Sequence, residues 1–434
     1  MELASAAAAP DQKAASFWKD PAAWLREANF SRGYWTFFAA AFFFDAGFSI
    51  YAFLFNLYLL DCHFNERAMG LIGGAVTLGS MIGTLPAGAL ARKIGLRPIL
   101  IALFVLAPIL HALRVLVMWE TAQIGLAFLT GLAMSSWGVC FLPAIARLTT
   151  EKNRTAGFSA IFSVSIGSAM LGGIVCGYLR QWLAGIGFAL EPAAVKRLIL
   201  SASCALVLVG LVPVLRLRMP AITSEGSESD LSAVKLKGLA KFALSPFLVR
   251  FLPAMALWCG VTAAFTPFAN VYLARNLHVP MQQIGIVFSA VQFLQLCMGV
   301  ATPIIFKRLG LAKGIVVSQI SAALVLGALA LATNGTLALG LFLVFSAAQW
   351  MSAPGLYNFL MNETPDEARS TAASLTLFSN ALAGSLATAA AGALLTRFGY
   401  RPVFFGIAVE ALAIGLLFMV LFSPWRKRAT QQNS

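Results

Sequence analysis

Apolar stretches of about 20 residues recur along this chain, with short polar segments between them. As helices, they are long enough to cross a hydrocarbon core of about 30 Å. Only 11% of the 434 residues are charged, whereas a water-soluble domain has about 25%, so the chain cannot cover itself with a water-compatible surface. No alternation of period two is visible, which argues against an outer-membrane barrel. The sequence therefore predicts an all-α polytopic membrane protein.

The apolar stretches predict twelve transmembrane helices in two groups of six. The widest break between them is basic at both ends and contains serine and glycine, as expected of a loop between two bundles. The expected organisation is an N-terminal tail with an amphipathic surface helix (1–33), a six-helix bundle (34–215), a central loop (216–246), a second six-helix bundle (247–423) and a C-terminal tail (424–434). The expected spans are 34–60, 68–91, 98–118, 121–146, 156–182, 197–215, 247–275, 284–306, 312–333, 336–361, 370–396 and 401–423.

Lysine and arginine fall unevenly on the two sides of these spans. With both termini on one side, that side holds 23 of the 31 basic residues and the other side holds seven. Basic loops stay in the cytoplasm, so we expect both termini to be cytoplasmic, with the protein in a bacterial inner (plasma) membrane. The basic residues lie in short runs between spans, which argues against nucleic acid as a partner. The six cysteines show no CxxC pairing, and we expect a monomer without a cofactor or a metal site.

An offset of 214–215 residues brings the two groups of spans into register. It pairs Asn56 in "FNLYLL" with Asn270 in "ANVYLA" and, after a gap of one residue, Gly70 with Gly285. One offset that holds across five helices and their loops is hard to obtain by chance. Two tandem halves with six helices each have the same topology, so an axis along the membrane normal can relate them.

The repeat and the loop "GALARKIGLRP" together resemble the major facilitator superfamily. In this loop, Gly88, Lys93, Gly95 and Arg97 fit the family's Gly-x-Leu-x-Asp-Arg-x-Gly-Arg-Lys pattern. The resemblance covers about 34–423 and implies two pseudo-symmetric six-helix bundles. It also implies transport by alternating access, with the first, fourth, seventh and tenth helices around a central cavity.

The loop departs from the family at Arg92, where the family has an aspartate that helps to latch the two halves together. Acidic residues instead precede the eleventh span. They are either capping residues of that helix or a reversed latch, in which Asp366 or Glu367 faces Arg92 or Lys93 across the halves. The candidate gating residues are Gly88, Arg92, Lys93, Gly95, Arg97, Asp366, Glu367 and Arg369.

The first span carries a narrow stripe of small and polar residues on an otherwise aromatic and aliphatic helix. A helical residue advances about 100°, so the members of this stripe fall within about 40° of one another. The repeat gives the seventh span a matching stripe, and we expect both to face another helix or water. The stripes are Asp45, Ser49, Ala52 and Asn56, and Cys259, Ala263, Thr266 and Asn270.

Asp45 is the stripe residue that most needs an explanation. An unpaired carboxylate near the middle of a bilayer costs about 2.5–3.5 kcal/mol on insertion scales, so it indicates either a function or a structural partner. The neighbouring phenylalanines 42–44 favour the neutral acid, which would ionise when it is exposed to water on one side. Closure would then require a proton or a cationic substrate. We expect Asp45 to couple protons to transport.

Further cavity candidates are amide, hydroxyl and aromatic residues on the fourth, eighth, tenth and eleventh spans. Together they suit an organic solute with apolar faces and a few polar groups, although each one can also be an ordinary contact between helices. The substrate-cavity candidates are Ser49, Asn56, Ser136, Trp137, Cys259, Thr266, Asn270, Gln292, Gln295, Gln349, Trp350, Tyr357 and Asn380.

Two further ionisable residues, His111 and Arg114, lie one turn apart near the outer end of the third span. An arginine near a helix end can extend its side chain to the membrane surface. We therefore expect Arg114 to snorkel.

The sequence as a whole favours a proton-coupled secondary transporter of a small organic solute, with aromatic residues leaning toward export. The chain contains no GxxxxGK[ST] motif and no catalytic cluster at one depth, so we do not expect an ATPase or another enzyme. Two alternatives stay open. One is a metal-ion exporter that uses Asp45 and Cys259 as ligands, and the other is a receptor on the same scaffold that does not transport.

Overall fold

The computed structural model describes residues 29–151, 153–185, 191–219, 245–365 and 368–422. Every secondary-structure element in these ranges is a helix, and twelve helical segments are long and apolar enough to cross a membrane. The predicted fold class is confirmed. The surface helix of the N-terminal tail and most of the central loop lie outside the described residues.

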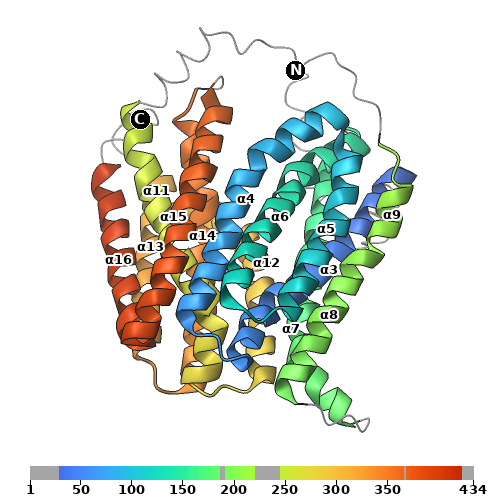
Figure 1. The fold of residues 1–434 in the computed structure, drawn as a ribbon. Coiled ribbons are helices and arrows are strands. Elements are labelled where there is room, and N and C mark those ends of the chain that lie inside the picture. Colours follow the sequence, from blue (N-terminus) through green and yellow to red (C-terminus); the bar gives the residue numbers. More distant parts are fainter. Residues whose placement is uncertain (1–28, 152, 186–190, 220–244, 366–367, 423–434) are drawn as a thin grey trace, which may run out of the picture.

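The helices form two bundles that lie side by side (Figure 1). In the first bundle α8 and α9 together make the sixth span, and in the second bundle the π-helix η2 continues α11. The first bundle contains α3 (Arg32–Asp61), α4 (Glu66–Ile94), α5 (Leu96–Leu116), α6 (Glu120–Leu148), α7 (Arg154–Gly185), α8 (Pro192–Val209) and α9 (Leu211–Arg216). The second contains α11 (Pro246–Val271), η2 (Tyr272–Asn276), α12 (Met281–Leu309), α13 (Leu311–Leu331), α14 (Gly335–Asn362), α15 (Arg369–Phe398) and α16 (Tyr400–Leu421).

Short polar residues determine where several helices begin. The side chains of Ser31, Asn65 and Ser245 each accept a hydrogen bond from a backbone N–H in the first turn of α3, α4 and α11. Such caps satisfy donors that a helix start leaves without a partner. The helices therefore begin before the apolar stretch itself, as in α4, which starts at Glu66 where hydropathy predicted 68.

The internal repeat is visible in the backbone. Each end of α12 lies 215 residues after the matching end of α4 (281 against 66, and 309 against 94). Positive φ angles recur at the same offset in the loops before and after these helices. The pairs are His63 (64°) with His278 (50°), and Gly95 (88°) with Gly310 (80°).

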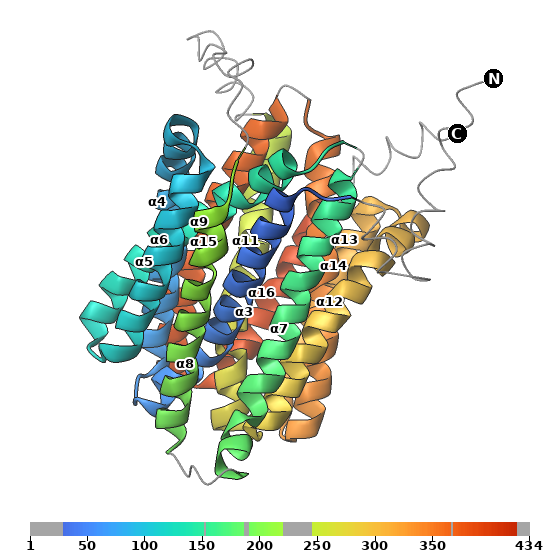
Figure 2. The same cartoon turned by 90° about the vertical axis from the view of Figure 1, so that its right-hand side faces the viewer.

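The two bundles meet at one end and diverge toward the other. We call the end where α4 finishes the basic end, because it carries Arg92, Lys93 and Arg97. The sealed end is the opposite one, where α3 finishes at Asp61 and α4 begins at Glu66. Figure 1 shows α4 and α15 close together at the sealed end and separating toward the basic end. The second junction joins α7 and α12, which lie side by side in Figure 2.

Glycines allow the backbones to meet at the sealed end. A Cβ atom on Gly70 of α4 would lie 2.9 Å from the Cα of Gly392 in α15, and one on Gly285 of α12 would lie 3.0 Å from the Cα of Gly177 in α7. No side chain fits in either place. Gly285 and Gly392 lie 215 residues after Gly70 and Gly177 (285 against 70, and 392 against 177), so the same sequence positions build both junctions.

Candidate functional site

Two asparagines join α3 to α11 across the bundles. Asn56 Nδ2 donates to the backbone oxygen of Pro267 at 2.7 Å, and Asn270 Nδ2 donates to that of Phe53 at 2.9 Å. The two bonds are equivalent under the repeat, since both asparagine and acceptor shift by 214 residues (270 against 56, and 267 against 53). Both stripes therefore face the opposite bundle. The two amide groups, which the sequence predicts as cavity residues, thus bond across the bundles near the sealed end.

Between these asparagines and the basic end, the stripes include residues whose side chains are exposed. Ala52 and Thr266 are equivalent under the repeat, and both are exposed. One turn further, Ser49 and Ala263 are half-buried. Because the stripes face each other, these side chains border the region between the two bundles.

Asp45 lies three turns from Asn56 on the same stripe, and the two positions differ by about 20° around the helix. Its side chain is half-buried, and one carboxylate oxygen accepts a hydrogen bond from Ser165 Oγ of α7. Two salt bridges occur within the described residues, and neither includes Asp45. The carboxylate thus has a neutral partner, so a proton or a cation can reach it without displacing a basic side chain.

The stripe of the second bundle gathers neutral groups instead. The Cys259 sulfur of α11 lies against α15, 3.9 Å from the position that a Cβ atom on Gly384 would occupy, and Asn380 precedes Gly384 by one turn on that helix. In the described part of the chain, no three histidine, cysteine or acidic side chains cluster as a metal site would require.

The other expected cavity residues are scattered. Trp350 lies two turns before Tyr357 on α14, and both side chains are exposed. Trp137 packs inside the first bundle, where its ring stacks on Phe44 with the centroids 4.2 Å apart. Ser136, Gln292, Gln295 and Gln349 are half-buried.

The loop between α4 and α5 is fastened to the first bundle. Gly88 is half-buried near the end of α4, and Gly95 ends that helix with a φ of 88°, which a residue with a side chain rarely adopts. The Arg97 guanidinium donates to the backbone oxygen of Leu215 in α9 at 2.7 Å. Arg97 therefore joins two parts of the same bundle.

The reversed latch stays a prediction. Arg92 and Lys93 are exposed at the basic end, as a latch would require. Their expected partners, Asp366 and Glu367, lie outside the described residues. Arg369, which follows them, donates from Nε to the backbone oxygen at position 361 at 3.2 Å.

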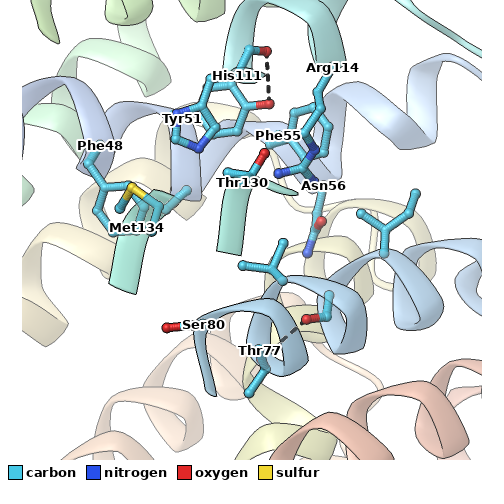
Figure 3. Close-up of a pocket in the computed structure, with 14 residues that line it drawn as sticks. Phe48, Tyr51, Phe55, Asn56, Thr77, Ser80, His111, Arg114, Thr130 and Met134 are labelled. Carbon is cyan, nitrogen blue, oxygen red and sulfur yellow. Dashed lines mark hydrogen bonds between the residues drawn. The ribbon is translucent and has the colours of Figure 1, made fainter. Parts of the chain in front are cut away.

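A pocket of about 520 Å³ opens between α3, α4, α5 and α6, beside the sealed end (Figure 3). Asn56 lies on its wall and joins it to the contact with α11. The other lining residues are Phe48, Tyr51, Ala52, Phe55, Ile72, Gly73, Val76, Thr77, Ser80, His111, Arg114, Thr130 and Met134.

Arg114 contradicts the expectation that it snorkels. Its side chain is buried, with 4% exposed, and its guanidinium carbon lies 4.4 Å from the centre of the Phe55 ring in this pocket. The helix turns the arginine inward, next to His111, which is also buried and whose ring packs on Tyr51. The apolar stretch around them places both residues in a span, where an ionisable side chain is a signal of function.

A charged contact that the sequence analysis missed also links the bundles at the sealed end. Glu66 Oε1 at the start of α4 pairs with Arg275 Nη1 of η2 at 2.6 Å and accepts a hydrogen bond from the Tyr400 hydroxyl at 2.9 Å. Both partners belong to the second bundle. The pair therefore strengthens the sealed end only while the bundles are in contact there.

Within the described residues, twelve helices long and apolar enough to cross a membrane form two repeated bundles that meet at one end, an arrangement typical of membrane transporters. The sequence matches the Major Facilitator Superfamily over residues 37–388, and the chain belongs to this family. No curated protein matches the sequence.

Solved structures of transporters share the fold. The nucleoside transporter NupG has a TM-score of 0.74 at 16% identity, with 90% of this chain and 99% of that chain covered. A D-xylose-proton symporter has a TM-score of 0.68 at 15% identity, with 89% and 96% covered. A bacterial homologue of the human lysosomal transporter Spinster, in an inward-facing and unoccupied conformation, has a TM-score of 0.72 at 13% identity, with 92% and 98% covered.

Proposed function

We propose that this transporter couples the movement of a small organic solute to protons, and that Asp45 carries the proton. The observation that carries the proposal is the position of Asp45. The carboxylate lies on a stripe that faces the other bundle, and its hydrogen-bond partner is the neutral Ser165. An acid in this position can exchange a proton with water on one side while the opposite side is closed.

The cycle follows from the cost of burying a charge. An ionised Asp45 is tolerated while the basic end is open, because water solvates it. When the bundles close at that end, desolvation opposes the charge, so closure favours the protonated acid. A membrane potential of 100 mV is worth about 2.3 kcal/mol per proton, which corresponds to a gradient of about 50-fold.

We further propose that the basic end faces the cytoplasm of a bacterium, with both termini on that side, because it carries the basic loops. The structure then corresponds to an inward-facing state. The solute would enter the space bordered by Ala52, Thr266, Trp350 and Tyr357, whose side chains are exposed. The aromatic members favour amphipathic compounds and export, in a monomer that acts without a cofactor.

Transport in proteoliposomes under an imposed pH gradient tests the proposal. The panel contains nucleosides and pentoses, chosen from the structural neighbours, together with amphipathic amines and carboxylates. We expect the gradient to drive accumulation of at least one class by about tenfold. The Asp45→Asn variant should lose that accumulation but still exchange labelled for unlabelled solute, because exchange needs no net proton transfer.

The matched control is the other aspartate of the same helix, Asp61, which pairs with Lys196 at 2.7 Å within the first bundle. Asp61→Asn should keep gradient-driven accumulation within about twofold, as expected for an ion pair near the protein surface. Accumulation by Asp45→Asn at the level of the unmodified protein would rule out Asp45 as the proton carrier.

A further inference from the structure

Arg114 is a buried cation without a counter-ion. Of the two salt bridges within the described residues, neither involves this arginine, and its Nε atom is buried without a hydrogen-bond partner. The guanidinium carbon lies 4.4 Å from the centre of the Phe55 ring. A second ring, that of Tyr51, lies at 6.0 Å.

Such an arrangement is unfavourable for an empty protein. A cation held away from water loses hydration, and the face of an aromatic ring returns only part of that energy. Within the described residues, the buried carboxylate of Glu66 by contrast has an ionic partner, Arg275. The missing partner of Arg114 is therefore best supplied from outside the chain.

The cavity next to the guanidinium has room for that partner. Its volume is about 520 Å³, and Figure 3 shows the guanidinium of Arg114 near Thr130 and Asn56, with Thr77 and Ser80 on the opposite wall. The rings of Tyr51 and Phe55 form an apolar side. A small organic molecule with one anionic group and an apolar body fits these walls.

We propose that this pocket binds the carboxylate of an organic monoanion, with Arg114 as its anchor. The inference rests on the proposed function, because it names the chemical class of the transported solute. A guanidinium fork matches the two oxygens of a carboxylate and forms charge-assisted hydrogen bonds with them.

The charge of the pocket favours a monoanion over a dianion. Arg114 and His111 are the lining residues that can carry a positive charge, and Arg114 is the one that is charged at every ordinary pH. A bound carboxylate neutralises it, whereas a phosphate with two charges would leave one negative charge in a site poor in water. The first bundle would then hold both ions of the cycle, the proton on Asp45 and the anion on Arg114.

Ligand-dependent thermal unfolding of the purified full-length protein in detergent tests this proposal. The probes are benzoate and hexanoate at millimolar concentrations, each compared with its uncharged amide. We expect at least one carboxylate to raise the Tm by several degrees, because a ligand that binds the folded state stabilises it, while the amide has no effect.

Two variants separate binding from packing. Arg114→Met should unfold at the same temperature as the unmodified protein or higher, because it removes a cation that lacks a partner, and it should lose the carboxylate shift. Arg114→Lys keeps the charge without the fork and should bind about tenfold more weakly. The matched control is Arg397→Gln, which alters an exposed arginine that lies 5.1 Å from the Phe398 ring, and it should keep the full shift.

Three results would overturn the inference. The first is an unmodified protein that no carboxylate stabilises. The second is a carboxylate shift that persists in Arg114→Met. The third is stabilisation by inorganic phosphate or by phosphatidylglycerol alone, which would identify a phosphate site.

The unfolding test does not depend on proton coupling. Equilibrium binding of a carboxylate should persist in Asp45→Asn, so a failed pH-gradient experiment with intact carboxylate binding contradicts only the proposed function. Gradient-driven accumulation of a neutral solute that survives Arg114→Met contradicts only the anion site.

Discussion

The two bundles share the residues that form the contacts between them, but they differ in the ionisable residues within their spans. Equivalent glycines and asparagines close the sealed end from both sides, at offsets of 214 and 215 residues. The ionisable residues at depth do not repeat. Asp45 corresponds to Cys259 at the offset of 214, and at 215 His111 and Arg114 correspond to leucines 326 and 329. The repeat therefore preserves contacts between the bundles, while these three ionisable side chains of the first bundle have neutral counterparts in the second.

The largest loss of transport is expected from substitutions at the junction glycines, which the two bundles share. Gly392→Leu and Gly285→Leu place side chains where even a Cβ atom would lie 2.4 Å from the Glu66 backbone oxygen and 2.3 Å from that of Gly173. Backbone atoms cannot move aside, so each variant should lower transport by at least about tenfold and by similar amounts.

Spin labels at the sealed end provide the structural measurement. Attached at Glu120→Cys and Thr336→Cys in a chain freed of its own cysteines, they should report a longer distance in both glycine variants. The control is Gly406→Leu, since a Cβ on Gly406 of α16 meets no atom within 4 Å. Normal transport by one of the two glycine variants would show that the junctions are not equivalent.

A smaller and equally symmetric effect is expected at the asparagines. Asn56→Leu and Asn270→Leu each remove one hydrogen bond across the bundles, worth about 1 kcal/mol, which corresponds to a shift of about fivefold toward the state open at that end. The fraction of molecules with the longer distance between the two spin labels measures this shift. A shift in only one variant would mean that the two bonds are unequal in solution.

The smallest effect is expected where the bundles differ. Cys259→Ser should keep gradient-driven transport within about threefold, because this neutral residue is the counterpart of Asp45 under the repeat and carries no proton in the proposed cycle. The same flux assay measures it beside Asp45→Asn. Equal loss in both variants would favour the metal-exporter alternative, in which both residues are ligands.

The sequence predicted the transmembrane helices and the internal repeat of this protein well. Apolar length located all twelve spans, and the repeat paired Gly70 with Gly285, two residues that the structure places in the junctions, because both are properties of the sequence pattern. The residues of the site were harder to place. Periodicity placed Asn56 on a stripe that faces another helix or water, but only the structure shows that its amide bonds to the backbone oxygen of Pro267 in the other bundle. Arg114 was misplaced because hydropathy gives the depth of a residue but not the direction its helix turns it.

The bond between Arg97 and the backbone of Leu215 has a mechanical consequence. The chain leaves the first bundle a few residues after Leu215, on its way to the second. A force on this part of the chain is transmitted through the hydrogen bond of Arg97 to the loop that follows α4, at the end where the two bundles diverge. Tension along the covalent connection would thus reach the end of α4, because that helix leads directly into the fastened loop.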